Sequence, residues 1–157
     1  MSEVAYEAEY LRGIEQFNAR EFFDAHDEWE ALWARTHGPS RLFYKGLIHA
    51  AVALHHFGNG NLRGARKLFG SCLRYLAPYA PLYLGLDVQA FLTQMQRCFA
   101  GLAPSGSQST EVRLDVTQIP RLLLDPPPAG SHGQGLLAGD LGADEADEGF
   151  RARAPHA

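Results

Sequence analysis

Apolar residues recur at helical spacing through the first two thirds of the chain, and the pattern then stops. An α-helix returns to the same face every three or four residues. This period is present over residues 4–19, 22–36, 41–57, 62–76 and 88–100. Gly and Pro follow the later segments, as expected at helix ends. Ser40, Asn61 and Asp87 precede the third, fourth and fifth segments and are their expected N-caps. The pattern predicts an all-α fold, a single bundle of about five helices.

The third segment, 41–57, is apolar on nearly every side. A helix without a polar face must be covered by neighbours on most sides, so this segment is predicted to be the central helix of the bundle. Gly46 in its middle is less favourable than Ala by about 1 kcal/mol, and it indicates that a neighbouring element comes close there. An apolar central helix also permits a homodimer, although the sequence alone names no partner.

The composition changes where the helical period ends, after Gly101. Residues 102–125 start with Pro, Ser and Gly and then carry scattered apolar positions, which favours an extended strap lying on the bundle. Residues 126–157 begin with three prolines and continue with Gly, Ala, Asp and Glu, a composition typical of a disordered tail. We therefore expect a helical domain (1–101), a strap (102–125) and an acidic tail (126–157).

The charge of the chain follows the same boundary. The net charge is -4 for 157 residues. Residues 1–101 hold ten acidic and ten basic side chains, whereas residues 102–157 hold eight acidic and four basic ones, so the whole excess lies in the last third. A mildly negative charge argues against bulk attraction to nucleic acid or to an anionic membrane.

Several features predict a cytoplasmic protein. No apolar run reaches the roughly 18–20 residues that a membrane span needs, and the N-terminus lacks the basic start and apolar run of a signal peptide. The two cysteines, Cys72 and Cys98, are too few for a disulfide framework and lie at apolar helix positions. Neither has a neighbouring His or Lys that would activate it as a nucleophile.

The run from His26 to Trp33 is the strongest indication of chemistry. Because successive helical residues are about 100° apart, His26, Trp29 and Trp33 share one stripe. Glu30 lies at its edge, four residues after the histidine and within its reach. Titratable groups beside large aromatic rings are unfavourable to bury unless each finds a partner. The pair therefore indicates either a functional site or a structural network.

One hypothesis is a metal site. Imidazole and carboxylate groups bind zinc, iron or manganese. His26 and Glu30 would supply two ligands from one helix, and His55 on the central helix would supply a third. Asp27 or Glu30 would act as the base towards a metal-activated water, which is the chemistry of hydrolysis. The residues expected to line the pocket are Trp29, Trp33, Lys45 and His49.

A second hypothesis needs no metal. His26 and Glu30 would hydrogen bond to each other or to the central helix as a buried polar network, and the two tryptophans would belong to the core. The protein would then be a non-catalytic helical module that binds a protein partner or a small ligand. The spacing His-x-x-x-Glu alone is neither a zinc-protease nor a di-iron signature, so both hypotheses stay open.

The segment 62–76 carries a basic face. Helical arrays of Arg and Lys are usually solvated surface, and no zinc finger or interleaving of aromatic and basic residues accompanies this one. Nucleic acid is therefore not an expected partner. The basic residues of this face are Arg63, Arg66, Lys67 and Arg74.

Four motifs follow one another in the first 101 residues. Residues 22–33 read aromatic-aromatic-Asp-Ala-His-Asp-x-x-Glu-x-x-Trp, and residues 46–55 begin Gly-Leu-Ile and end Ala-Leu-His. Residues 60–65 contain Gly-Asn and Gly-Ala, and residues 81–87 read Pro-Leu-Tyr-Leu-Gly-Leu-Asp. In order and spacing the four together resemble the bacterial and archaeal family called domain of unknown function 309.

The resemblance implies an all-α bundle, in agreement with the periodicity. For function it implies only a loose description, that of predicted metal-dependent hydrolases. The chain departs from the family pattern at Lys45, where Gln is expected before the glycine, and an ammonium group there changes the charge and removes an acceptor. The combined expectation is a metal-dependent hydrolase whose His/Glu site on the second helix faces the central helix.

Overall fold

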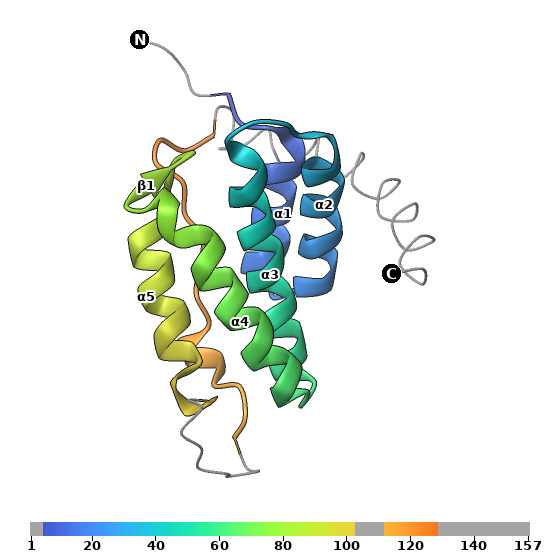
Figure 1. The fold of residues 1–157 in the computed structure, drawn as a ribbon, viewed down its shortest axis with the longest axis vertical. Helices are drawn as coiled ribbons and strands as arrows, with labels where there is room; N and C mark the ends of the chain where they lie inside the picture. Colours follow the sequence, from blue (N-terminus) through green and yellow to red (C-terminus); the bar gives the residue numbers. More distant parts are fainter. Residues whose placement is uncertain (1–4, 103–111, 129–157) are drawn as a thin grey trace.

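The computed structural model describes residues 5–102 and 112–128, and it confirms the all-α fold (Figure 1). Within these ranges five α-helices follow one another and correspond to the five predicted segments. Their bounds are α1 (Ala8–Asn18), α2 (Phe22–Arg35), α3 (Ser40–Gly58), α4 (Leu62–Leu76) and α5 (Val88–Cys98). The shorter elements are the 3₁₀ turns η1 (Ala77–Tyr79), η2 (Ala100–Leu102) and η3 (Val116–Gln118) and the strands β1 (Leu82–Tyr83) and β2 (Leu86–Asp87).

The helix α3 lies at the centre of the bundle, as the sequence predicts. It packs against both α2 and α4, while α1 packs against α2 (Figure 1). Gly46 explains how α4 comes so close, because a Cβ atom there would lie 2.6 Å from the Leu76 side chain. The buried residues of α3 are Phe43, Tyr44, Gly46, Leu47, Ile48, Ala50, Ala51, Ala53, Leu54 and Phe57.

The contact between α1 and α2 is built around Trp29. Its indole is fully buried and lies against Gly13, where a Cβ atom would come within 2.0 Å of the indole Nε1. The Nε1–H donates to the Tyr10 carbonyl oxygen at 3.3 Å, and the Phe17 ring lies 5.9 Å away between centroids. Trp29 therefore sets how α2 is rotated against α1, and hence which residues of α2 face α3.

Two predicted helix caps are confirmed and one is wrong. Asn61 and Asp87 accept hydrogen bonds from the backbone N–H groups three residues later, at 3.0 and 2.8 Å, and these bonds satisfy amides that a helix start leaves unpaired. Ser40 was expected to cap α3, but the N-cap is Pro39 and Ser40 is the first helical residue. The Ser40 hydroxyl is instead hydrogen bonded to that of Tyr83 at 2.7 Å, so it makes a tertiary contact rather than a helix cap.

A short β-hairpin, not predicted from the sequence, connects α4 to α5. Its strands β1 and β2 pair antiparallel through Leu82 with Asp87 and Tyr83 with Leu86. The two residues between them, Leu84 and Gly85, have φ angles of 46° and 77°, and two positive values are what a tight hairpin turn requires.

Residues 112–125 of the expected strap lie along the bundle (Figure 1). Leu122 is 1% exposed, and both its N–H and its carbonyl oxygen are hydrogen bonded to the side-chain amide of Asn18, each at 2.8 Å. Leu124 forms an antiparallel bridge with Leu86 of the hairpin. The strap therefore joins α1 to the hairpin. The predicted tail lies outside the described residues except for 126–128.

The two cysteines are buried, as expected for small core residues. Burial raises the pKa of the Cys72 thiol to about 12 and that of Cys98 to about 11, so both stay protonated at neutral pH and are poor nucleophiles. None of the helices in the described part of the chain is long and apolar enough to cross a membrane.

Candidate metal centre

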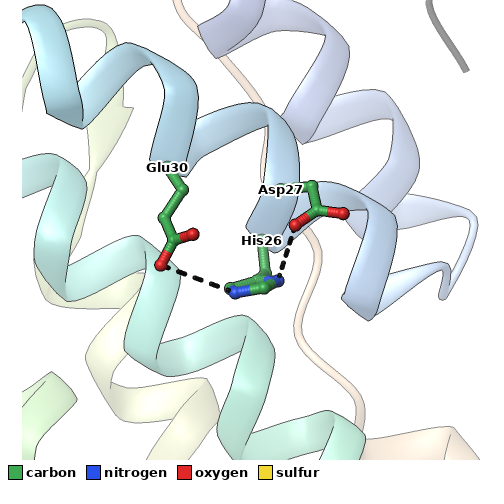
Figure 2. Close-up of side chains that lie close together, drawn as sticks. All are labelled: His26, Asp27 and Glu30. Carbon is green, nitrogen blue, oxygen red and sulfur yellow. Dashed lines mark ion pairs between the residues drawn. The ribbon is translucent and has the colours of Figure 1, made fainter. Parts of the chain in front are cut away.

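The helix α2 brings together a histidine and two carboxylates. Its core side is formed by Phe22, Ala25, Trp29 and Leu32, whose spacing follows the helical period. His26 and Glu30 are four residues apart, which places their side chains on the same side of the helix. Figure 2 shows the His26 ring between the carboxylates of Asp27 and Glu30.

Each ring nitrogen of His26 has a different carboxylate neighbour. The Nδ1 atom lies 3.5 Å from Asp27 Oδ1, and the Nε2 atom lies 3.7 Å from Glu30 Oε2 (Figure 2). The Nδ1 atom is also 3.2 Å from the Phe23 carbonyl oxygen. If Nδ1 carries the proton and donates it to that carbonyl, Nε2 keeps its lone pair. Such a hydrogen bond is the usual way in which a metal-binding imidazole is oriented.

Two of the three donors, His26 and Glu30, are spaced for a single divalent ion. One ligand atom from each of His26, Asp27 and Glu30 can be chosen so that the three lie within 4.8 Å of one another. Two ligands about 2.1 Å from a zinc ion are about 3.4 Å apart at a tetrahedral angle and at most about 4.2 Å apart. The 3.7 Å between His26 Nε2 and Glu30 Oε2 lies inside that range.

The three side chains differ in their exposure. The side chain of His26 is 9% exposed and that of Asp27 14%, whereas that of Glu30 is 49% exposed. The group is therefore held from the protein side by the histidine and opens to solvent at Glu30.

His55, the predicted third ligand, lies near this group without joining it. Its Nε2 atom is 3.2 Å from the Asn59 side-chain nitrogen, and its ring lies 5.2 Å from that of Phe23. The Phe23 ring is equally close to His26, at 5.0 Å, so it contacts both imidazoles. Burial lowers the pKa of His55, and the nearby His56 and His26 lower it further. The structure thus brings Asp27, rather than His55, together with His26 and Glu30.

Two cations stand over the Trp33 ring one turn beyond Glu30. The Arg41 guanidinium carbon lies 4.0 Å from the centroid of the indole and the Lys45 ammonium nitrogen 4.7 Å away. Arg41 also donates to the carbonyl oxygens of Trp33 and Thr36 at the end of α2. Among the described residues, Lys45 has neither a hydrogen bond nor an ion pair. Trp33 therefore lies against two cations of α3.

His49 lies one turn after Lys45 on α3. Its ring meets that of Tyr75 edge to face at 5.3 Å. Burial lowers its pKa, with further lowering by the charges of Lys45 and Arg74, so the imidazole is neutral at neutral pH. Within the described residues, its Nδ1 atom is buried without a hydrogen-bond partner, and so is the Trp33 Nε1 atom. Trp29, also expected in the pocket, is fully buried in the core and has no surface to offer a ligand.

Sequence reasoning did not single out Phe23, Arg41 or the buried acid Glu28. Glu28 is 2% exposed and forms an ion pair with Arg12 of α1 at 3.1 Å. The Phe23 carbonyl oxygen could have been inferred, because it lies one turn before His26. The places of Arg41 and Glu28 depend on how helices pack against one another, so spacing along the chain carries no signal for them.

Comparison with known proteins confirms the resemblance read from the sequence. The model of the family "Domain of unknown function (DUF309)" matches residues 10–68. The chain is 32% identical over 98 residues to "Uncharacterized protein YpuF" of Bacillus subtilis (strain 168), a match covering 60% of this chain and 56% of that protein. It is 28% identical over 97 residues to an "Uncharacterized protein" of Aquifex aeolicus (strain VF5), covering 59% of this chain and 29% of that one. The matches therefore span about half of the first relative and under a third of the second.

Proposed function

We propose that this protein, whose residues 10–68 match a family of unknown function, is a metal-dependent hydrolase with its ion held on α2. The observation that supports this most is the 3.7 Å separation of His26 Nε2 and Glu30 Oε2, with the other ring nitrogen directed at a backbone carbonyl. Asp27 is the third proposed ligand. The ion would be zinc, iron or manganese, for which imidazole and carboxylate ligands are suited.

A divalent ion in such a site supplies a water of lowered pKa and polarises a carbonyl or phosphoryl oxygen. The protein's own part begins with orientation, because the Phe23 carbonyl oxygen holds the His26 ring in place. Each carboxylate has two oxygen atoms, so Asp27 and Glu30 can each bind through one and accept a proton on the other. Glu30 is the half-exposed member, and it is therefore the base that an incoming substrate meets first.

We infer that Trp33, Arg41 and Lys45 form one wall of the site and give it a preference for negatively charged substrates. Trp33 follows Glu30 by three residues, and this spacing places it on the same side of α2. The Lys45 ammonium group, with no carboxylate to neutralise it among the described residues, favours a substrate that carries an anionic group. The proposed reaction is hydrolysis of an ester, amide or phosphoester bond in such a substrate.

Metal content tests the proposal directly. We would purify tag-free protein without chelators and measure bound metals by elemental mass spectrometry for the wild type, His26→Ala, Glu30→Gln and the control His37→Ala. His37 is exposed and lies outside the metal group. We expect about one ion per chain in the wild type and control, none in His26→Ala, and at least about tenfold weaker binding in Glu30→Gln.

Hydrolysis is then screened with phosphatase, esterase and amidase substrates on the metal-loaded wild type and on His26→Ala. Activity present only in the wild type supports the proposal. Wild-type protein without metal, or His26→Ala with unchanged metal, contradicts the site itself. A bound ion without any activity contradicts the hydrolase alone. If His26→Ala loses the same stability with and without added metal, the group is structural and the protein is better described as a binding module.

A further inference from the structure

A cavity of about 480 Å³ lies between the first half of α4 and the end of α5, away from the α2 group. Its size is within the range of small-molecule binding sites. None of its lining residues belongs to the proposed metal centre. They are Arg63, Arg66, Lys67, Phe69, Gly70, Phe99 and Leu102.

The floor of the cavity is apolar. The rings of Phe69 and Phe99 stack in parallel with their centroids 4.5 Å apart. Phe99 and Leu102 are each 2% exposed, so the half-buried Phe69 supplies the apolar side-chain surface that a ligand can cover. At Gly70 a Cβ atom would meet nothing within 4 Å, so the space above the backbone is open there. A hollow with such a floor favours an alkyl chain, because apolar surface buried from water contributes about 25 cal/mol per Å².

The rim of the cavity is strongly positive. Arg63, Arg66 and Lys67 are exposed, and within the described residues none of their side chains has an ion pair or a hydrogen bond. Arg66 and Lys67 follow Arg63 by three and four residues, close enough for like charges on a helix to repel. Arg63 also lies in the first turn of α4, where the helix dipole disfavours cations.

Folding does not require these charges. α4 contains no Asp or Glu that would balance them, and it packs through Ala65, Cys72 and Leu76 on its other face. A bound anion would relieve the repulsion among the three cations and the conflict of Arg63 with the helix dipole. The unpaired cations favour an anionic head group, and the apolar floor favours an alkyl chain. A single ligand that carries both would therefore suit the cavity.

We propose that this cavity binds a free amphipathic anion, with a carboxylate head at Arg63, Arg66 and Lys67 and a medium-length alkyl chain over Phe69 and Gly70. The inference is independent of the metal site and stands if that site fails.

Calorimetric titration with octanoate tests the proposal, with octanamide as the neutral probe of the same chain length. Octanoate should bind the wild-type chain saturably at one site. Octanamide should bind about tenfold more weakly or worse, because it lacks the charge that the three cations recognise.

Three variants separate the parts of the site. Gly70→Leu places a side chain in the open space and improves helix propensity, so it should fold at least as well as the wild type while weakening octanoate binding about tenfold or more. Arg66→Gln should weaken binding about tenfold. Arg74→Gln, a charge change on the same helix outside the cavity, should stay within about twofold of the wild type.

Saturable binding with this order of affinities supports the proposal. The absence of saturable octanoate binding to the wild type overturns it. So does equal affinity for octanamide, since the cations would then have no role, and so does full affinity in folded Gly70→Leu, since the ligand would then lie elsewhere.

Discussion

The indole of Trp29 occupies the place that a methyl group on Gly13 would need, with its Nε1 atom 2.0 Å from the ideal Cβ position. Gly13 lies inside α1, where glycine is otherwise unfavourable by about 1 kcal/mol relative to Ala. At this residue the close approach of two helices therefore outweighs local helix preference. Gly70 inside α4 is the opposite case, because a Cβ atom there meets open space.

We predict that Gly13→Ala lowers the free energy of unfolding by about 1–3 kcal/mol, because the new methyl group must displace the indole. The matched change Gly70→Ala should raise it by up to about 1 kcal/mol through helix propensity alone. Urea unfolding followed by circular dichroism measures both. If Gly13→Ala gained as much stability as Gly70→Ala, the contact between Trp29 and α1 would be wrong.

The sequence predicted the part of the candidate site that lies within a single helix. The i,i+4 spacing of His26 and Glu30 indicated their proximity, and they lie 3.7 Å apart. The proposed contribution of His55 required knowing how α3 is rotated against α2. That rotation depends on packing, and His55 lies beside Phe23 and Asn59 instead.

Between elements, α1 and α2 are joined by an ion pair at their exposed ends. Arg35 of α2 donates to both carboxylate oxygens of Glu9, at 2.9 and 3.0 Å, and lies 3.4 Å from Glu7. The hydrogen bonds from Arg35 are the main cause that lowers the pKa of Glu9 below its ordinary value of 4.5. A bidentate pair of this kind is the favourable geometry for a surface ion pair.

This pair predicts a pH-dependent contribution to stability. Because the Glu9 pKa is lower in the folded protein than in the unfolded chain, the contribution is fully present above pH 4.5 and is lost as the pH falls through the folded value. Arg35→Gln should therefore lower the melting temperature at pH 7 and match the wild type in strong acid. Calorimetry from pH 7 down to strong acid measures the melting temperatures, with exposed Arg97→Gln as the control. A pH-independent loss in Arg35→Gln would show that the ion pair is not its cause.

The hairpin between α4 and α5 shows what escapes prediction at the level of elements. Its strands are two residues long, and its turn has Leu84 where Asn or Gly would signal a positive φ. Position 85 requires glycine, because a Cβ atom there would lie 2.3 Å from the Tyr6 hydroxyl. Partners far away in the sequence therefore support this turn.

At the scale of the whole molecule, the strap closes the fold. The hydrogen bonds between Asn18 and Leu122 join positions 104 residues apart, and the Leu122 side chain is buried with the core. Its neighbour Leu123 is 69% exposed. The two adjacent leucines thus offer a comparison in which only burial differs.

We predict that Leu122→Ala lowers the free energy of unfolding by about 2–5 kcal/mol, because it leaves a cavity beneath the strap. Leu123→Ala should change it by no more than about 0.5 kcal/mol. Chemical unfolding of the full chain measures both variants. Equal, small effects would mean that the strap does not belong to the folded core in solution.

The sequence by itself determined the five helices, the apolar character of α3, the caps Asn61 and Asp87, and the proximity of His26 and Glu30. Each follows from interactions within a few residues of the chain, where backbone geometry leaves little freedom. Only the tertiary structure decided that Asp27 rather than His55 completes the group on α2, and that Trp29 is core while Trp33 meets Lys45. It also decided that three cations surround a cavity between α4 and α5. These depend on how helices rotate and pack against one another, and the periodicity of one helix does not contain that information.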